Sequence, residues 1–506
     1  MPSSYRGAVR LLGFLVVVGV VAGCSPGVAE PGPDSGKAGP TGTSASPPAV
    51  ATPEPASVVL TTDRDRRSGI VADGGGDSPY NYGPTVLLEN GRYRMWWCSQ
   101  LGYAAPAGDD LLYAESTSPD GPFSAPGGGS AIPVLSGSTS GFDGKHTCDP
   151  SVIKVGPTYY LYYTGAAGEH AHGNAIGVAT STDGLTWARA ADGKPIVSPS
   201  YDTTRENTYG AGQPSVLYLD GWFYLMFTDT TGKAAGWNGA GQFVLRSKVA
   251  TFLTGVEALG PNGFHKVEDA HSTRERSVVD AFSADLSFVP ALDAFVIAHE
   301  TEQGTTLTFW NRDFTAEPYG RVHVAGPWRE GPGLVRTPHG LVPVSDEDPC
   351  GRIAFDVVRA TVDGRAGAPT DLTHFGLDVA EAPGCATTRA AAALEGFAVP
   401  SPENTVDLVL KGQVVRIERR SVTDRLATKV LDHRPAIVDK LPVKARIPAG
   451  AKAVRSPDGT VGLVLGDDKK VWLVDAEEIA ALNGSTVTAV SKQTWDGYQP
   501  VRDLLR

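Results

Sequence analysis

Four polar residues that could take part in catalysis stand at the start of a repeated sequence phrase. The phrase is a polar residue, a proline in its best copies, a β-branched run, a turn and an aromatic-rich run. Its polar residues are Asp149, Gln213, Asp285 and Glu330. Carboxyl groups that lie close together raise one another's pKa, so that one holds a proton while another stays ionised. Such a pair can cleave a glycosidic bond, because one group protonates the leaving oxygen and the other activates water or attacks the sugar.

The elements that must position these residues follow from the repeat. Clear copies begin at Gly83, Asp149 and Gln213, and weaker copies begin at Asp285 and Glu330. Each copy leaves room for about four short strands, the size of one propeller blade. Third strands are expected at residues 110–114, 175–179 and 243–246. We predict an all-β fold with a five-bladed β-propeller over residues 58–370; a β-sandwich is the alternative, but sandwiches do not repeat a sequence phrase.

The propeller arrangement predicts which side chains converge. The innermost strand of every blade lines the central channel, and the loops entering those strands meet at one end of it. We therefore expect Asp149, Gln213, Asp285 and Glu330 to approach one cavity. The first copy begins with Gly83 and has no carboxylate, so Asp77 in the preceding glycine-rich stretch is a further catalytic candidate.

Other polar and aromatic residues are expected near the mouth of this cavity. The candidates for contacts with a sugar are Tyr82, His146, Arg205, Gln213 and Glu300. The aromatic runs at residues 159–163 and 222–227 are expected to pack mainly between blades. No P-loop, dinucleotide fingerprint or nucleophile elbow is visible.

The N-terminal segment indicates export. Arg6 and Arg10 precede an apolar run at residues 11–21, and Val21 to Cys24 resembles a bacterial lipobox. We expect residues 1–24 to be a lipoprotein signal peptide with Cys24 as the lipidated residue. Residues 25–57 are rich in Pro, Gly, Ser, Ala and Thr, which predicts a disordered linker. The expected location is the extracytoplasmic face of the cell membrane, with the lipid anchor as the only membrane contact.

The remaining cysteines and the net charge narrow the class of protein. Four cysteines besides Cys24 are an even number in a compartment that permits disulfides. Pairing of Cys98 with Cys148, and of Cys350 with Cys385, is plausible for adjacent blades, but the sequence leaves the pairing open. The cysteines lack the short Cys-x-x-Cys spacing of zinc ligands, so no metal site is expected. The net charge of −12, without a basic run after the signal, argues against nucleic acid as a partner.

The chain changes character after the repeats. Residues 386–506 are expected to form a small β-rich α+β domain whose role stays open. Its expected strands are residues 406–410, 413–417, 461–465 and 470–474. Helix is expected at residues 390–394 and 476–482.

The repeat with its Asp-Pro and Glu-Gly-Pro steps resembles the five-bladed propeller glycosidases, a group that includes arabinanases, arabinofuranosidases and β-xylosidases. The matching residues are Asp149 before Pro150, Glu330 before Gly331 and, more loosely, Asp285. The resemblance implies Glu330 as the acid, Asp149 or Asp77 as the base or nucleophile, and Asp285 as a tuning carboxylate. The chain departs from the pattern in two ways: its first blade lacks a carboxylate, and its glutamate stands in the fifth blade rather than the third.

The resemblance implies a surface-anchored glycoside hydrolase that cleaves a furanose- or pentose-containing polysaccharide of the arabinan or arabinogalactan type. A monomer without a cofactor is expected; a structural calcium ion in the channel stays open, because no oxygen-rich loop motif indicates one. The alternative is a non-catalytic carbohydrate-binding propeller lipoprotein, which Gly83 favours and the channel carboxylates oppose. A propeller that serves as a protein-interaction scaffold in the envelope is a third reading.

Overall fold

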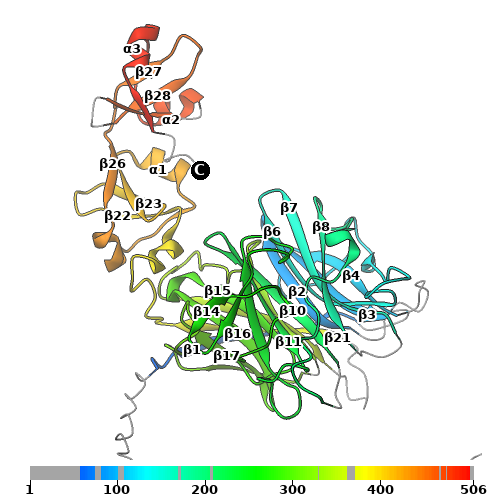
Figure 1. Ribbon diagram of the computed structural model, residues 1–506. Coiled ribbons are helices and arrows are strands. Elements are labelled where there is room, and N and C mark those ends of the chain that lie inside the picture. The colour runs from blue at the N-terminus through cyan, green and yellow to red at the C-terminus, as the bar shows by residue number, and fades with distance from the viewer. Residues whose placement is uncertain are drawn as a thin grey trace, which may run out of the picture. The chain divides into compact units, whose positions relative to one another are not determined.

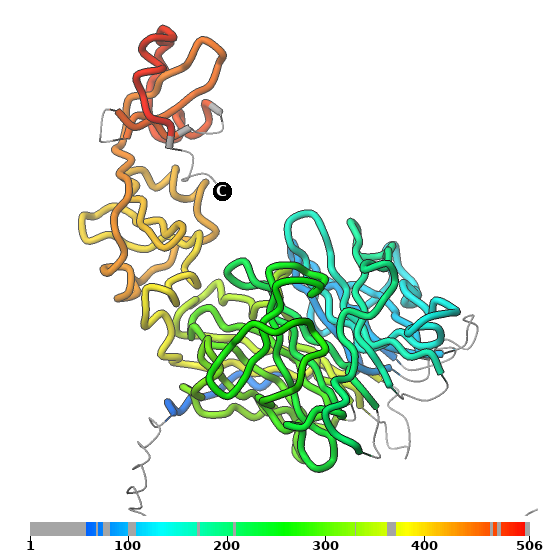
Figure 2. The backbone as a smooth tube through the Cα atoms, in the orientation of Figure 1, coloured from blue at the N-terminus to red at the C-terminus, as the bar shows by residue number. Residues whose placement is uncertain are grey.

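Short β-strands make up most of the computed structural model (Figures 1 and 2). The structure describes residues 57–73, 81–100, 108–168, 173–205, 209–328, 330–361, 371–465, 469–473 and 476–501. Three α-helices are described, and all are short: α1 (Arg420–Leu426), α2 (Ala476–Leu482) and α3 (Lys492–Asp496). Within the described residues, no helix has both the length and the apolar character needed to cross a membrane.

Five antiparallel units follow one another between β1 and β21, and each begins with the strand that carries the repeated phrase. Unit 1 holds β2 (Tyr82–Glu89), β3 (Arg92–Gln100), β4 (Asp109–Ser116) and β5 (Ile132–Leu135). Unit 2 holds β6 (His146–Val155), β7 (Thr158–Ala166), β8 (Ala175–Ser181) and β9 (Ala188–Arg189). Unit 3 holds β10 (Ala211–Leu219), β11 (Trp222–Asp229), β12 (Gln242–Ser247), β13 (Glu257–Gly260) and β14 (Gly263–Lys266).

Units 4 and 5 complete the series. Unit 4 holds β15 (Ala284–Val289), β16 (Ala294–Thr301), β17 (Gly304–Trp310) and β18 (Val322–Ala325). Unit 5 holds β19 (Pro332–Arg336), β20 (Ile353–Thr361), β21 (Asp371–Ala380) and, from the other end of this region, β1 (Thr61–Ala72). The first strands of the units are neighbours in the order β2, β6, β10, β15 and β19, and β19 returns to β2 through a parallel pairing. The series is therefore closed into a ring.

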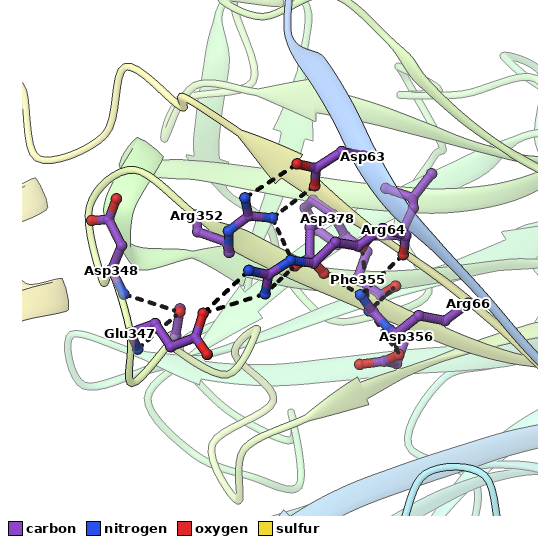
Figure 3. Close-up of polar contacts among 11 residues, drawn as sticks. Asp63, Arg64, Arg66, Glu347, Asp348, Arg352, Phe355, Asp356 and Asp378 are labelled. Carbon is purple, nitrogen blue, oxygen red and sulfur yellow. Dashed lines mark hydrogen bonds and ion pairs between the residues drawn. The ribbon is translucent and has the colours of Figure 1, made fainter.

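Strand β1 closes unit 5 by pairing antiparallel with β21. Ion pairs strengthen this attachment, as Figure 3 shows. Arg66 on β1 contacts Asp356 on β20 at 2.9 Å, and it also contacts Asp378 on β21. Arg352 bridges Asp63 and Asp378 at 2.7 and 3.0 Å. Residues from the two ends of this region thus share one sheet and one charge network.

Hydrophobic clusters fill the spaces between neighbouring units, as expected for aromatic and β-branched strands that pack face to face. One cluster joins units 2 and 3 around Tyr162 and Leu225, and another joins units 3 and 4 around Met226 and Phe295. Two further clusters lie between units 5, 1 and 2 and between units 4 and 5. The prediction that the aromatic runs pack between units is confirmed for most of their residues.

The expected third strands are confirmed as β4, β8 and β12. Two expectations in unit 5 are wrong. The run 341–344 was expected to be its second strand, but that strand is β20, because Pro343 interrupts the run and has no N–H for a ladder. The sheet also continues through β21 to Ala380, beyond the expected end at residue 370, because β21 is the strand that pairs with β1.

The chain after Ala386 holds two sheets of the same topology. The first has the order β25-β22-β23-β24-β26, and the second has the order β30-β27-β28-β29-β31. Their strands are β22 (Phe397–Pro400), β23 (Val406–Leu410), β24 (Gln413–Ile417), β25 (Lys429–Val430), β26 (Val443–Ile447), β27 (Ala453–Arg455), β28 (Val461–Val464), β29 (Lys470–Leu473), β30 (Val487–Ala489) and β31 (Gln499–Val501). In both sheets the outer strands pair in parallel and a helix, α1 or α2, follows the third strand.

The sequence carries the same duplication. Ala-Val-x-Ser-Pro-x-x-Thr-Val-x-Leu-Val-Leu begins at Ala398 and again at Ala453. The expected strands and the helix at residues 476–482 are confirmed, and residues 390–394 form a short 3-10 helix. The region is therefore two copies of one module rather than a single irregular domain.

The disulfides Cys98–Cys148 and Cys350–Cys385 are both present, as expected. The first joins unit 1 to unit 2, directly before Asp149. The signal peptide, Cys24, the linker up to residue 56 and Asp77 lie outside the described residues.

Candidate functional site

One pocket collects the starts of all five inner strands. Its free space is about 360 Å³. The lining residues are Gly83, Pro84, Asp149, Pro150, Gln213, Pro214, Ser283, Ala284, Asp285, Glu330, Gly331 and Pro332. The four polar residues at the starts of the sequence phrase therefore lie around one cavity.

Four of the five strand starts share a backbone conformation. Gly83, Asp149, Gln213 and Gly331 have φ values of 53°, 48°, 50° and 53°, and each precedes a proline. In the three units that begin with Gly83, Asp149 and Gln213, the strand ladder is interrupted at this step. A left-handed residue followed by proline turns the chain at the mouth of the pocket, and this puts the first side chain of each unit at the rim.

Asp285 occupies a deeper position than Asp149. Side-chain oxygens of Thr85, Ser151, Ser215 and Asp285 each accept a hydrogen bond from the backbone N–H of the next inner strand. Asp285 is thus equivalent to Ser151 and Ser215, two residues beyond the rim position that Asp149 holds. The rim position of unit 4 belongs to Ser283.

Asp285 is committed to a buried arginine. Its Oδ1 lies 3.1 Å from Nη1 of Arg336, whose side chain has no exposed surface, and its Oδ2 accepts the N–H of Leu334 at 2.7 Å. Arg336 donates to Thr85 Oγ1 at 2.7 Å and to the carbonyl oxygen of Leu286 at 3.1 Å. The guanidinium therefore fills the channel below the pocket and ties several inner strands together, with Asp285 as its counter-ion.

Asp149 is the carboxyl group whose environment departs most from water. Its side chain reaches the pocket but is otherwise enclosed by protein, and this burial raises its pKa to about 7. The charge of Glu330 raises the pKa further, and the charge of Asp109 adds to the effect. Hydrogen bonds from Thr164 and from Tyr209, whose Oη is 3.4 Å from Oδ2, oppose the shift. At neutral pH, Asp149 can therefore hold a proton beside a second carboxyl group.

Glycine at two rim positions gives Asp149 its space. A Cβ at Gly83 would lie 3.2 Å from Oδ1 of Asp149, and a Cβ at Gly331 would lie 3.0 Å from the Cα of Gly83. The first unit therefore lacks a carboxylate at the rim because the neighbouring carboxylate lies against its backbone.

Glu330 lines the pocket one residue before the left-handed Gly331. Its side chain is half-buried, and its backbone carbonyl accepts the N–H of Ala360 at 3.3 Å. This bond fixes the segment that carries Glu330 to β20. Glu330 and Asp149 thus come from units on either side of unit 1 and face the same space.

Asp109, which the sequence did not single out, lies behind Asp149. Tyr82 Oη donates to Asp109 Oδ2 at 3.3 Å. The backbone N–H of Asp109 donates to His146 Nδ1 at 3.0 Å, and Oδ2 lies 3.1 Å from the same nitrogen. Tyr82 and His146 were expected to meet substrate, but the pocket lining does not include them; they hold Asp109.

Gln213 lines the pocket as expected and is nine-tenths buried. Its backbone N–H donates to Thr164 Oγ1 at 2.7 Å. Within the described part of the chain, its Oε1 is buried and has no hydrogen-bond partner. This oxygen can accept a hydroxyl group of a ligand.

Arg205 and Glu300 lie away from the pocket lining. Arg205 Nη2 donates to the carbonyl oxygen of Ala235 at 3.0 Å and braces a neighbouring loop. Glu300 Oε2 accepts from Thr305 Oγ1 at 3.1 Å, and burial raises the pKa of its carboxyl group to about 7. Neither side chain has a printed contact with Asp149 or Glu330 among the described residues.

The potential metal ligands do not form a usable site. In the described ranges, the sole group of three potential ligand atoms belongs to Cys98, Asp109 and Cys148. Both cysteines are in a disulfide and offer no thiolate.

Comparison with known proteins gave structural matches only: no family model and no curated protein matches this sequence. A family 117 glycoside hydrolase from the marine bacterium Zobellia galactanivorans is 12% identical, with a TM-score of 0.39 over 62% of this chain and 91% of that chain. The catalytic domain of the family 62 α-L-arabinofuranosidase from Coprinopsis cinerea is 14% identical, with a TM-score of 0.39 over 64% of this chain and 98% of that chain. A family 62 hydrolase in complex with xylotriose is 13% identical, with a TM-score of 0.38 over 62% and 96%.

At these TM-scores and identities the matches carry no argument about the site, whose geometry is that of this chain's own strands. The solved structures to which this chain is similar are glycoside hydrolases.

Proposed function

We propose that the region from β1 to β21 is a five-bladed β-propeller whose central pocket hydrolyses glycosidic bonds. The ring of five inner strands, the apolar clusters between units and the closure of unit 5 by β1 support the propeller. The observation that carries the activity is the shared pocket of Asp149 and Glu330, two carboxyl groups in unequal environments.

The environments favour a division of labour opposite to the one that the sequence suggested. The raised pKa of Asp149 favours its protonated form, so Asp149 is the general acid. It donates its proton to the glycosidic oxygen as the bond from that oxygen to the anomeric carbon breaks. Glu330, as the carboxylate, either attacks that carbon or takes a proton from the water that attacks it.

The other pocket residues have supporting roles in this proposal. Asp285 balances the charge of Arg336 and keeps the inner strands in register. Asp109 keeps the proton on Asp149 through its negative charge. Gln213 accepts a sugar hydroxyl group at the rim.

The substrate class and the location come from the sequence resemblance. We propose a furanose- or pentose-containing polysaccharide of the arabinan or arabinogalactan type, and a protein anchored by lipid at Cys24 and held off the membrane by the linker. The two modules after residue 386 are appended to the enzyme and take no part in the reaction in this proposal.

The experiment is the release of reducing ends from arabinan, xylan, galactan and arabinogalactan by the purified protein, together with Asp149→Asn and Glu330→Gln. Asp432→Asn and Glu347→Gln are matched controls, because those carboxylates are exposed. The proposal predicts activity on at least one polymer, lost in both pocket variants and kept in both controls. Wild-type protein that binds one of these polymers without cleaving any of them would favour the non-catalytic alternative.

A further inference from the structure

Three aromatic side chains of the described residues are exposed to solvent: Tyr201 at 66%, Trp237 at 94% and Trp328 at 37%. Large aromatic rings are usually mostly buried in a folded protein, and a Trp left in water indicates an interaction surface when it has company. The question is whether these three lie together on one side of the molecule.

The strand register places all three at the end of the units where the pocket lies. Ala211 at the start of β10 pairs with Asp229 at the end of β11, so the loop at residues 230–241, which carries Trp237, is at the pocket end. Tyr201 is in the loop that enters β10. Trp328 is in the loop that enters β19 and stands two residues before Glu330.

The loops that carry these rings are braced by hydrogen bonds. The N–H of Tyr201 donates to Thr231 Oγ1 at 3.0 Å, and Asp202 Oδ1 accepts the N–H of Lys233 at 2.6 Å. The loop of Tyr201 and the loop of Trp237 are thus tied to each other. The indole N–H of Trp328 donates to the carbonyl oxygen of Thr301 at 2.5 Å, which fixes one edge of the ring.

Tyr201 also has a φ of 51°. The left-handed region is sparsely populated by bulky residues, and such residues gather where a function requires them. The surrounding bonds hold the Tyr201 backbone in this conformation while its ring remains in solvent.

The opposite end of the same units lacks exposed aromatic rings among the described residues. Its exposed apolar side chains in unit 3 are Val249 and Leu253, in the loop between β12 and β13. The aromatic character is therefore specific to the pocket end.

The ring order of the units places the three side chains on different sides of the pocket. Tyr201 enters at the boundary of units 2 and 3, Trp237 belongs to unit 3, and Trp328 enters at the boundary of units 4 and 5. The pocket itself is small, at the low end of the range of about 300–1,000 Å³ for small-molecule sites. A polymer must therefore gain most of its contacts outside the pocket.

We propose that Tyr201, Trp237 and Trp328 are stacking platforms for a neutral glycan chain that crosses the mouth of the pocket. The C–H groups on one face of a sugar ring pack against an aromatic face, while its hydroxyl groups stay in water or reach polar side chains. Platforms on two sides of the pocket place sugar rings on both sides of the scissile bond, which is the requirement for cleavage within a chain. The inference rests on the proposed function and adds to it the recognition of an internal segment of a polymer.

The test is affinity electrophoresis of the Glu330→Gln protein through gels that contain arabinan, xylan, galactan or arabinogalactan. In that background, Tyr201→Ala, Trp237→Ala and Trp328→Ala are compared with Trp237→Phe and with Leu253→Ala at the opposite end. We expect each alanine variant to raise the dissociation constant for the bound glycan about tenfold, as for the loss of one aromatic contact. Trp237→Phe keeps most of the affinity, and Leu253→Ala leaves it unchanged.

Two results would overturn the inference: retardation by one of the four glycans that is equal in all three alanine variants, or no retardation by any of them. The readout is separate from catalysis. Retardation that depends on the rings, in a protein whose wild type cleaves nothing, supports the platforms and defeats the hydrolase. Cleavage with an unchanged KM in all three alanine variants defeats the platforms alone.

Discussion

Gly83 and Asp149 hold equivalent rim positions in neighbouring units, and the carboxylate of Asp149 lies where a side chain at position 83 would begin. A Cβ at Gly83 would be 3.2 Å from Oδ1 of Asp149. The missing carboxylate of the first unit is thus the condition for the carboxylate of the second, and it is no sign that the site has lost its chemistry.

Gly83→Ala should damage the site through this contact. The φ of 53° costs a residue with a Cβ about 1–2 kcal/mol, and the new methyl group crowds Asp149. We expect the free energy of unfolding to fall by about that amount and kcat/KM to fall at least about tenfold. Gly91→Ala is the control, because φ is 74° there and its Cβ would meet nothing within 4 Å. Equal losses of activity in both variants would show that backbone strain alone is responsible.

Removal of the charge at Asp109 should shift the pH dependence of activity. Activity requires protonated Asp149, so it falls as the pH rises through the pKa of about 7. Burial and Glu330 are the larger causes of that pKa, and Asp109 adds to them. In Asp109→Asn the ionised form of Asp149 becomes less costly, and we expect the alkaline limb of kcat/KM to move down by about half a pH unit or more.

Asp432→Asn is the control for this profile because its carboxyl group is fully exposed. If the limb of Asp109→Asn stays in place while only kcat falls, Asp109 has a steric role and does not hold the proton on Asp149.

Asp149 should also make stability depend on pH. Its pKa is 3.8 as a free group and about 7 in the folded protein, so between these values the folded state binds a proton that the unfolded state releases. The free energy of unfolding therefore falls as the pH rises from about 4 to 7. Asp149→Asn removes this loss, and we expect the variant to be about 1–3 kcal/mol more stable than the wild type at pH 8 in urea titrations. At pH 4 the two should be nearly equal; a variant that is less stable at both pH values would contradict the raised pKa.

Asp285→Asn should affect folding more than turnover. It leaves the buried guanidinium of Arg336 without its counter-ion, which costs about 3–5 kcal/mol of unfolding free energy. The folded fraction should keep kcat within a few-fold of the wild type, and Arg336→Met in the same chain should recover part of the stability. A stable Asp285→Asn protein with a hundredfold lower kcat would return Asp285 to the tuning role that the sequence resemblance implies.

Much of the site could be predicted from the sequence because each inner strand announces itself locally. The Asp149-Pro150 and Gln213-Pro214 steps predicted both the strand starts and their convergence, since a repeated phrase implies repeated geometry. The depth of Asp285 could not be read, because it depends on a shift of two residues that only the hydrogen bonds between strands define.

Two features were missed for different reasons. Asp109 begins a third strand, and its approach to His146 depends on how two loops fold against each other. The duplicated module was readable, since the phrase at Ala398 returns at Ala453, but it differs from the phrase of the inner strands.

The assignment of Asp149 as the acid and Glu330 as the group that acts at the anomeric carbon is the central claim. The measurement that tests it is the rate of each amide variant on the cleaved polymer and on an aryl glycoside of the same sugar, whose phenolate leaves without a proton. We predict that Asp149→Asn loses about 10²–10⁴-fold on the polymer but recovers most of its rate on the aryl glycoside. Glu330→Gln should be inactive on both substrates. Recovery by Glu330→Gln, with Asp149→Asn inactive on both, would contradict the account and restore the opposite assignment.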